Sequence, residues 1–139
     1  MHSPEEIIAL YRKKGLRITE QRRMIFNLLA EDYSHPTMEE IYQRLQNQLP
    51  DVSRSTVYKT LRELIEMGEL LEVEDIGKKG IRYDVNTRVH HHLYCTSCHK
   101  LVDIEPDLGS IELPDEDQEG FKIQRSQVTF FGLCSDCQG

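Results

Sequence analysis

Apolar side chains in the first half of the chain recur every three to four residues, the spacing that places them on one face of a helix. Each of these segments opens with a hydroxyl residue suited to cap a helix, at Ser3, Thr19, Thr37 and Ser53. The pattern therefore predicts amphipathic helices up to Gly68, each burying one apolar stripe. The predicted stripes are Ile7, Leu10 and Tyr11; Met24, Ile25, Leu28 and Leu29; Met38, Ile41, Tyr42 and Leu45; and Val57, Leu61, Leu64 and Ile65.

Two short β-rich runs follow these helices, Leu70–Glu74 and Ile81–Val85, and the turn-forming segment Gly77–Gly80 joins them. Helices followed by a hairpin with a basic tip form the element order of a winged-helix domain. A helical bundle whose charged residues are simply a solvated face is the alternative that the same residues allow.

Beyond the hairpin the period of the pattern changes from helical to alternating. Alternating residues predict strands over His90–Cys95, Lys100–Ile104 and Phe121–Leu133. The acidic segment 108–119 predicts at most a short helix, because a glycine and a proline interrupt it. The sequence thus predicts an α+β fold in two domains.

Charge is distributed unevenly along the chain, whose formal net charge is −7. Residues 1–68 carry ten basic and ten acidic side chains, whereas residues 89–139 carry three and nine. The first part can therefore present a local basic face although the whole chain is acidic. Apolar runs are too short to span a membrane and the N-terminal residues lack the layout of a signal peptide, so we expect a cytoplasmic protein.

The helix that begins after Ser53 is the predicted recognition helix for DNA. Its first turns are rich in side chains suited to phosphate and base-edge contacts, and its N-terminus adds a partial positive charge. A basic hairpin tip would add contacts to the DNA backbone or minor groove. The predicted DNA contacts are Arg17, Arg54, Ser55, Thr56, Tyr58, Lys59, Lys78 and Lys79.

All four cysteines of the chain occur in two C-x-x-C pairs, Cys95 with Cys98 and Cys134 with Cys137. A tight turn at each pair would aim its two thiolates at one point, and two such turns give the tetrahedral S4 set of a structural zinc ion. Disulfides or free thiols are the alternatives, and metal binding is favoured in a chain without a secretion signal. We expect this closed zinc site to stabilise the second domain.

Histidines and carboxylates form a second group of candidate ligands. His90 and His92 share one face of the predicted strand, and Asp103 lies on the neighbouring strand. Asp84 ends the hairpin, and His35 lies between the second and third helices. Three nitrogens and two carboxylates without sulfur suit Fe(II) or Mn(II). The alternatives are a surface-loop histidine, an exposed strand edge and a turn aspartate.

Short motifs follow one another in order along nearly the whole chain. They are G-L-R-I-T-E-Q-R at Gly15–Arg22, S-H-P-T at Ser34–Thr37, S-T-V-Y-K-T-L at Ser55–Leu61, R-Y-D at Arg82–Asp84, H-H-H-L-Y-C-x-x-C at His90–Cys98 and C-x-x-C at Cys134–Cys137. In this order they resemble the ferric uptake regulator (Fur) family. The resemblance implies a winged-helix DNA-binding domain over residues 1–85 and a small α/β dimerisation and metal-binding domain over residues 86–139. It also implies a homodimer that represses transcription at a double-stranded DNA operator when metal is bound.

Within that family, the residues resemble the peroxide-sensing PerR branch, because His35, Asp84, His90, His92 and Asp103 match its regulatory metal site. The resemblance implies that hydrogen peroxide oxidises His35 and His90 in the Fe(II)-loaded protein, which then loses its metal and releases DNA. With Mn(II) the same protein would bind DNA and ignore peroxide.

Two histidines stay outside both predicted sites, and we expect His91 and His99 to be solvent-exposed. An iron-, manganese- or zinc-responsive uptake regulator without peroxide sensing is the alternative function within the family. A metalloenzyme is the alternative from another class. No motif places a general base or a substrate pocket, so we expect that the chain is not an enzyme.

Overall fold

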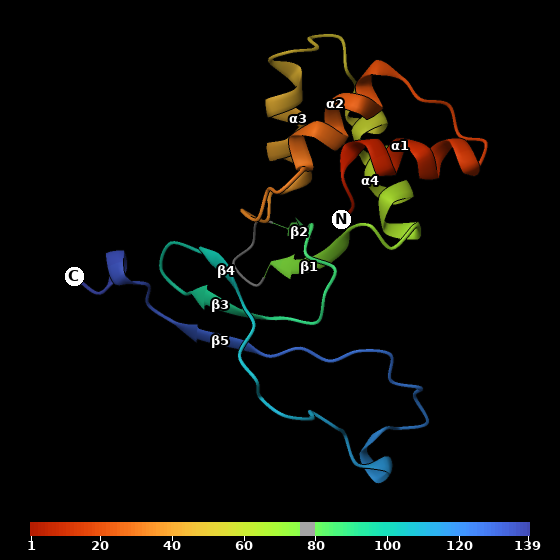
Figure 1. Ribbon diagram of the computed structural model, residues 1–139. Coiled ribbons are helices and arrows are strands. Elements are labelled where there is room, and N and C mark those ends of the chain that lie inside the picture. Colours follow the sequence, from red (N-terminus) through yellow and green to blue (C-terminus); the bar gives the residue numbers. More distant parts are fainter. Residues whose placement is uncertain (76–79) are drawn as a thin grey trace. The chain divides into compact units, whose positions relative to one another are not determined.

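The computed structural model describes residues 1–75 and 80–139 and divides the chain into two compact units, Met1–Thr87 and Arg88–Gly139 (Figure 1). The predicted DNA contacts Lys78 and Lys79 lie outside the described residues. None of the helices in the described residues is long and apolar enough to cross a membrane.

The first unit begins with the predicted helices, and each starts directly after its predicted cap. The side chains of Ser3 and Thr37 each accept the backbone N–H three residues on, from Glu6 and Glu40, and these glutamates complete capping boxes. The helices are α1 (Pro4–Lys13), α2 (Glu20–Leu29), α3 (Met38–Gln46) and α4 (Arg54–Glu66).

The core of the first unit contains most residues of the predicted apolar stripes, but the buried face of α2 differs from the predicted one. Ile25 and Leu29 are buried as predicted, but Phe26 is buried as well, whereas Met24 and Leu28 are only half-buried. The ring of Phe26 packs 4.9 Å from the ring of Tyr11, centroid to centroid. The larger aromatic surface is buried in preference to the two flanking aliphatic residues.

A partly buried polar contact joins three helices of this unit at Glu63 in α4. The Tyr11 hydroxyl donates to one carboxylate oxygen of Glu63 at 3.0 Å, and the Arg22 guanidinium donates to the other at 2.7 Å. Arg22 also lies over the Tyr11 ring and donates to the backbone carbonyl of Arg17. The connection between α1 and α2, which carries Arg17, is thereby tied to α4.

The predicted hairpin follows α4 as β1 (Leu71–Asp75) and β2 (Gly80–Asp84), which pair antiparallel. The Tyr83 N–H donates to the Pro36 carbonyl at 2.9 Å, so β2 is fastened to the segment that precedes α3. Four helices and a two-stranded wing in the described residues confirm the winged-helix prediction.

The second unit is a small sheet with strand order β4-β3-β5 (Figure 1). Its strands are β3 (His91–Cys95), β4 (Leu101–Ile104) and β5 (Thr129–Gly132). β3 pairs antiparallel with β4 and parallel with β5. Together the two units confirm the predicted α+β fold class.

One prediction for the second unit is wrong in extent, whereas the other, of at most a short helix, agrees with the structure. The long strand predicted over Phe121–Leu133 is reduced to β5, and the acidic segment 108–119 has only a 3-10 turn at Asp115–Asp117. The alternation in the first of these segments is broken by the polar stretch 124–127, so the apolar positions on either side belong to different faces. The 24 residues 105–128 therefore connect β4 to β5 with little regular structure.

Candidate metal centres and nucleic-acid interface

The four cysteines meet at one end of the small sheet. Parallel pairing places Cys95 beside Gly132, so β3 and β5 finish at the same end of the sheet. Each strand leads there into one of the two C-x-x-C turns. The four sulfur atoms all lie within 4.8 Å of one another, and Cys98 Sγ is 3.8 Å from Cys134 Sγ. No sulfur is in a disulfide among the described cysteines. Four thiols in this arrangement fit a tetrahedral S4 metal site.

Two of these thiols have pKa values shifted in opposite directions. The pKa of Cys95 is lowered to about 6, first because the backbone N–H groups of Cys134 and Cys98 donate to its sulfur. The pKa of Cys137 is raised to about 12: contact with the Ser97 side chain lowers it, but contacts with Cys134 and Cys98 raise it more. Neighbouring thiolates repel one another, and a cation at their centre removes that repulsion.

Two of the five predicted regulatory ligands lie in the first unit, where His35 contacts Asp84. Their side chains are both 0% exposed, and His35 Nε2 lies 3.4 Å from Asp84 Oδ2. His35 has a φ of 55°, a left-handed conformation that is uncommon for residues other than glycine. Such a backbone persists only where its surroundings impose it, and it is frequent at functional sites.

Asp32 holds the segment that leads into His35. One carboxylate oxygen accepts hydrogen bonds from the backbone N–H and the hydroxyl of Ser34, at 3.0 and 2.6 Å. The other accepts from Arg44 of α3 at 2.7 Å. Burial raises the pKa of Asp32, but these hydrogen bonds outweigh it and hold that pKa below its usual range. The ionised carboxylate therefore fixes the loop that carries His35 against α3.

The other three predicted ligands lie in the second unit: His90 directly before β3, His92 on β3 and Asp103 on β4. His92 is the register partner of Asp103, and His92 Nε2 is 3.1 Å from Asp103 Oδ1. His90 Nε2 lies 3.3 Å from the same oxygen and 3.1 Å from His92 Nε2. Two ring nitrogens and one carboxylate oxygen thus converge on one point.

The tautomer of His90 is fixed by its other nitrogen. His90 Nδ1 lies 2.6 Å from the Arg88 carbonyl, which can only accept, so Nδ1–H is the donor. In the neutral ring the lone pair is then on Nε2, the atom that faces His92 and Asp103. This is the arrangement in which histidine binds a metal ion.

The prediction that His91 is solvent-exposed is wrong. His91 is buried, and its Nδ1 accepts the backbone N–H of Val128 at 2.9 Å, directly before β5. His99 is half-buried, and its Nδ1 lies 2.7 Å from the Tyr94 hydroxyl. Val128 is 37 residues from His91, and Tyr94 lies across the Cys95–Cys98 turn from His99. The alternation of residues along a strand does not indicate either contact.

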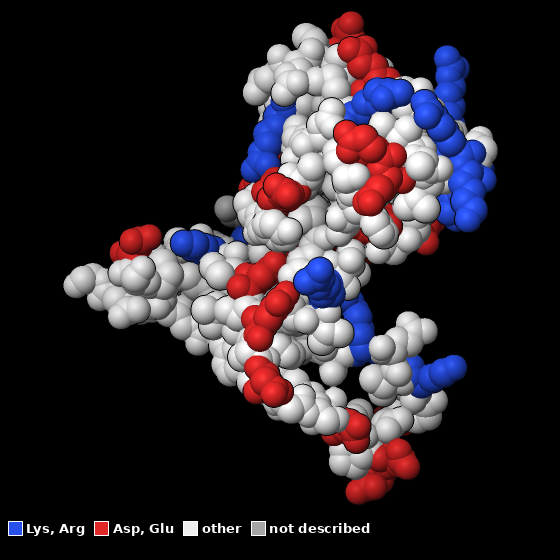
Figure 2. Space-filling view, viewed as in Figure 1, with Lys and Arg blue, Asp and Glu red and all other residues white. Residues whose placement is uncertain are grey.

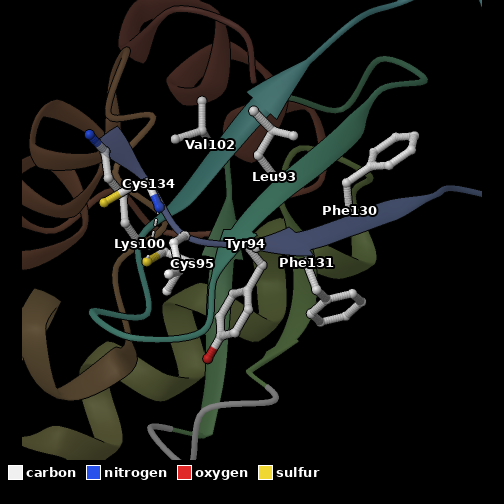
Figure 3. Close-up of a pocket in the computed structure, with 10 residues that line it drawn as sticks. Leu93, Tyr94, Cys95, Lys100, Val102, Phe130, Phe131 and Cys134 are labelled. Atoms are coloured by element: carbon white, nitrogen blue, oxygen red, sulfur yellow. Dashed lines mark hydrogen bonds between the residues drawn. The ribbon is translucent and has the colours of Figure 1, made fainter. Parts of the chain in front are cut away.

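The face of the sheet opposite His92 carries an exposed apolar row. Register places Val102, Leu93 and Phe130 side by side across β4, β3 and β5. Each is more than a third exposed, and they line a pocket of about 210 Å³ (Figure 3). In the close-up Leu93 and Val102 point away from Tyr94 and Phe131, which lie on the other side of the sheet.

The predicted DNA contacts on α4 are at its N-terminal end. Arg54, Ser55, Tyr58 and Lys59 are exposed, whereas Thr56 is half-buried and its N–H donates to the hydroxyl of Ser53 at 3.1 Å. The first turn of α4 contains no acidic residue. Arg17 is exposed in the connection between α1 and α2. Figure 2 shows a run of Lys and Arg side chains over the helices of the first unit.

Comparisons with known proteins agree with this geometry. The model of the ferric uptake regulator family matches residues 13–131. The peroxide-responsive repressor PerR of Staphylococcus aureus strain Mu50 is 37% identical over 99% of this chain and 93% of its own length. Among solved structures, PerR from Streptococcus pyogenes is 31% identical with a TM-score of 0.58, covering 99% of this chain and 95% of that one. The Helicobacter pylori ferric uptake regulator, at 22% identity and a TM-score of 0.73, covers 97% and 91% and shares the fold. The chain belongs to the ferric uptake regulator family.

Proposed function

We propose that this chain is a metal-dependent transcriptional repressor of the cytoplasm, not an enzyme, which senses hydrogen peroxide and then releases DNA. The observation that carries the proposal is the convergence of His90, His92 and Asp103 on one point, with a histidine tautomer ready to bind metal. The 37% identity with a peroxide-responsive repressor supports it.

Two metal ions with separate tasks are part of the proposal. A structural Zn(II) would be held by Cys95, Cys98, Cys134 and Cys137, whose sulfur atoms already lie within 4.8 Å of one another. This site has four protein ligands and no open position, so its effect is on folding of the second unit.

The regulatory ion, Fe(II) or Mn(II), would take nitrogen and oxygen ligands from both units. The first unit would supply His35 and Asp84, and the second His90, His92 and Asp103. A set without sulfur is the kind that suits these ions. Such an ion would connect the DNA-binding unit to the second unit, and losing one ligand would release that connection.

Bound Fe(II) would supply the redox chemistry with peroxide, and the chain supplies the group that is oxidised. A ring C–H of His35 or His90 gives up two electrons, one peroxide oxygen stays on the ring carbon and the other leaves as water. The oxidised ring gains one oxygen atom and binds metal more weakly. Mn(II) is much less able to promote this step.

DNA binding is proposed for α4 of each subunit in a homodimer. The contacts would be Arg17, Arg54, Ser55, Thr56, Tyr58 and Lys59, with Lys78 and Lys79 of the wing. Two recognition helices must match the spacing of two half-sites, so a change in the angle between units alters affinity for the operator. A second copy of this chain is the proposed occupant of the apolar row Val102, Leu93 and Phe130.

Mass spectrometry of the metal-loaded protein after dilute hydrogen peroxide tests the sensing step. With Fe(II), the peptide containing His35 or His90 should gain one oxygen atom and metal-dependent DNA binding should be lost. The Mn(II)-loaded protein, treated in parallel, should show neither change. An Fe(II)-loaded protein that stays unmodified and still binds DNA reversibly would contradict peroxide sensing.

That negative result would favour the second candidate, a metal-responsive uptake regulator. A zinc-bound manganese uptake regulator is 25% identical, with a TM-score of 0.65, over 96% of this chain and 99% of its own. The same nitrogen and carboxylate ligands would serve it, since Mn(II) and Fe(II) accept similar ligands.

A further inference from the structure

An ion pair connects α3 to the first residue of α4. The Arg54 Nε–H donates to Glu39 Oε2 at 3.0 Å, and Arg54 Nη2 donates to Glu39 Oε1 at 2.8 Å. Both oxygens of one carboxylate are thus engaged by one edge of one guanidinium. This two-point geometry fixes the direction of the Arg54 side chain.

Further contacts hold the same two groups in place. The guanidinium carbon of Arg54 lies 4.3 Å from the centroid of the Tyr42 ring, so one face of the cation is covered. Gln43 donates to Glu39 Oε1 at 3.0 Å. Of the five guanidinium N–H groups, the two on Nη1 and one on Nη2 are not used by Glu39.

Stability does not explain this arrangement. The Arg54 and Glu39 side chains are 57% and 50% exposed, and exposed ion pairs contribute little to folding. Hydrogen bonds from Arg54, and next from Gln43, lower the pKa of Glu39 to about 2, so the carboxylate is ionised at any pH at which the protein would meet DNA. A fixed negative charge therefore lies beside a predicted DNA contact.

We propose that Glu39 is a specificity-determining residue of the DNA interface, which cancels the charge of Arg54 while aiming its remaining N–H groups. The inference rests on the proposed DNA binding by α4. Binding to arbitrary DNA depends chiefly on charge, whereas discrimination between bases depends on directed hydrogen bonds. Glu39 would reduce the charge-dependent contribution of Arg54 to binding of arbitrary DNA and preserve its directed hydrogen bonds to bases.

The test compares Glu39→Gln with wild type, both zinc- and Mn(II)-loaded, by fluorescence anisotropy at several salt concentrations. One duplex is selected from a random pool by the wild-type protein, and the other has the same composition in shuffled order. For shuffled DNA, we expect the slope of log affinity against log salt to steepen by about 0.9 per bound protomer, and affinity at 0.1 M salt to rise roughly fivefold. Affinity for the selected duplex should rise less. The ratio of affinity for the selected duplex to affinity for the shuffled duplex should therefore fall roughly threefold.

Two controls separate this effect from the loss of any carboxylate near DNA. Glu66→Gln removes an exposed carboxylate at the other end of α4 and should leave the slope unchanged. In an Arg54→Leu background, Glu39→Gln should no longer steepen the slope. Equal steepening with and without Arg54, or no change in Glu39→Gln, would overturn the inference alone. Wild-type protein that binds no duplex when metal-loaded would overturn the proposed function and the inference with it.

Discussion

His92 and Asp103 face each other across the antiparallel pair β3 and β4, with His92 Nε2 3.1 Å from Asp103 Oδ1. The contact follows from strand register, because directly opposed residues bring their side chains together on the same face of a sheet. The length of the carboxylate side chain therefore decides how close its oxygen comes to both His92 and His90.

Lengthening that side chain tests whether its position matters for peroxide chemistry. In Asp103→Glu, one added methylene shifts the carboxylate by about 1 Å, and a displacement of that size can slow a reaction by about 100-fold. We expect Mn(II)-dependent DNA binding to persist while the Fe(II)-loaded protein gains oxygen about 10- to 100-fold more slowly. Timed mass spectrometry after peroxide measures the rate, with Asp107→Glu, an exposed position, as control. Equal rates in Asp103→Glu and wild type would exclude this role.

The loop that carries His35 offers a second test, which leaves every proposed ligand in place. Asp32→Asn removes the negative charge that accepts hydrogen bonds from Ser34 and Arg44, so His35 should lose its fixed position. Affinity for Mn(II) should fall about 10- to 100-fold, as when groups that orient metal ligands are lost. Electron paramagnetic resonance titration of free Mn(II) gives the affinity, and Asp51→Asn, an exposed position, should match wild type. An unchanged affinity in Asp32→Asn would show that the loop is held by other contacts.

Removing one thiol should destabilise the second unit alone. Cys137→Ser leaves three thiols, so the protein should be purified without stoichiometric zinc, and amides of β3 and β5 should exchange at least about 100-fold faster with deuterium. The exchange of α1–α4 should change far less, since their core is separate. Ser135→Ala, between the two cysteines, should retain zinc. A zinc-free Cys137→Ser protein with wild-type exchange in β3 would disprove the structural role of the metal.

Alkaline pH should reveal the burial of Tyr11. Burial, and next the Glu63 carboxylate, raise the pKa of Tyr11 above its ordinary value of 10.0. Because the folded-state pKa is the higher one, the stabilisation from neutral Tyr11 is complete below pH 10 and is lost as the pH rises further.

Tyr11→Phe should therefore be less stable than wild type at pH 8, by about 0.5–1.5 kcal/mol for the lost hydrogen bond. Between pH 10 and pH 11.5 the free energy of unfolding should fall less steeply with pH in Tyr11→Phe than in wild type. The two slopes should differ by up to about 1.4 kcal/mol per pH unit. Urea unfolding at several pH values measures both, and the exposed Tyr33→Phe should keep the wild-type slope. Identical slopes in Tyr11→Phe and wild type would contradict the raised pKa.

Local signals predicted the helices and the wing well, because a cap such as Thr37 and its partner Glu40 lie within one turn. The cysteine turns and the shared face of His90 and His92 were also predictable, since they depend on residue spacing. The long strand predicted from Phe121 was wrong because the polar stretch 124–127 breaks the alternation, and because the pattern does not report whether a neighbouring strand is present to pair with it.

Contacts between elements were beyond local patterns. The burial of Phe26 in place of Met24 depends on where α1 crosses α2, and the engagement of Arg54 by Glu39 depends on how α3 packs against α4. The sequence separation between Phe26 and Tyr11, or between Arg54 and Glu39, does not indicate that these side chains are in contact. The position of Val128 next to His91 likewise follows from the parallel pairing of β3 with β5, which brings together residues 37 apart.

The connection between β4 and β5 is far longer than the sheet requires. Both strands border β3, and β4 ends at the same edge where β5 begins, so a gap of about 10 Å could be closed by about four extended residues. The chain uses 24. Since the distance between the two strands does not fix the length of this segment, its length can change during evolution without altering the sheet. Relatives of this protein should accumulate insertions and deletions here first, with the strands on either side unchanged.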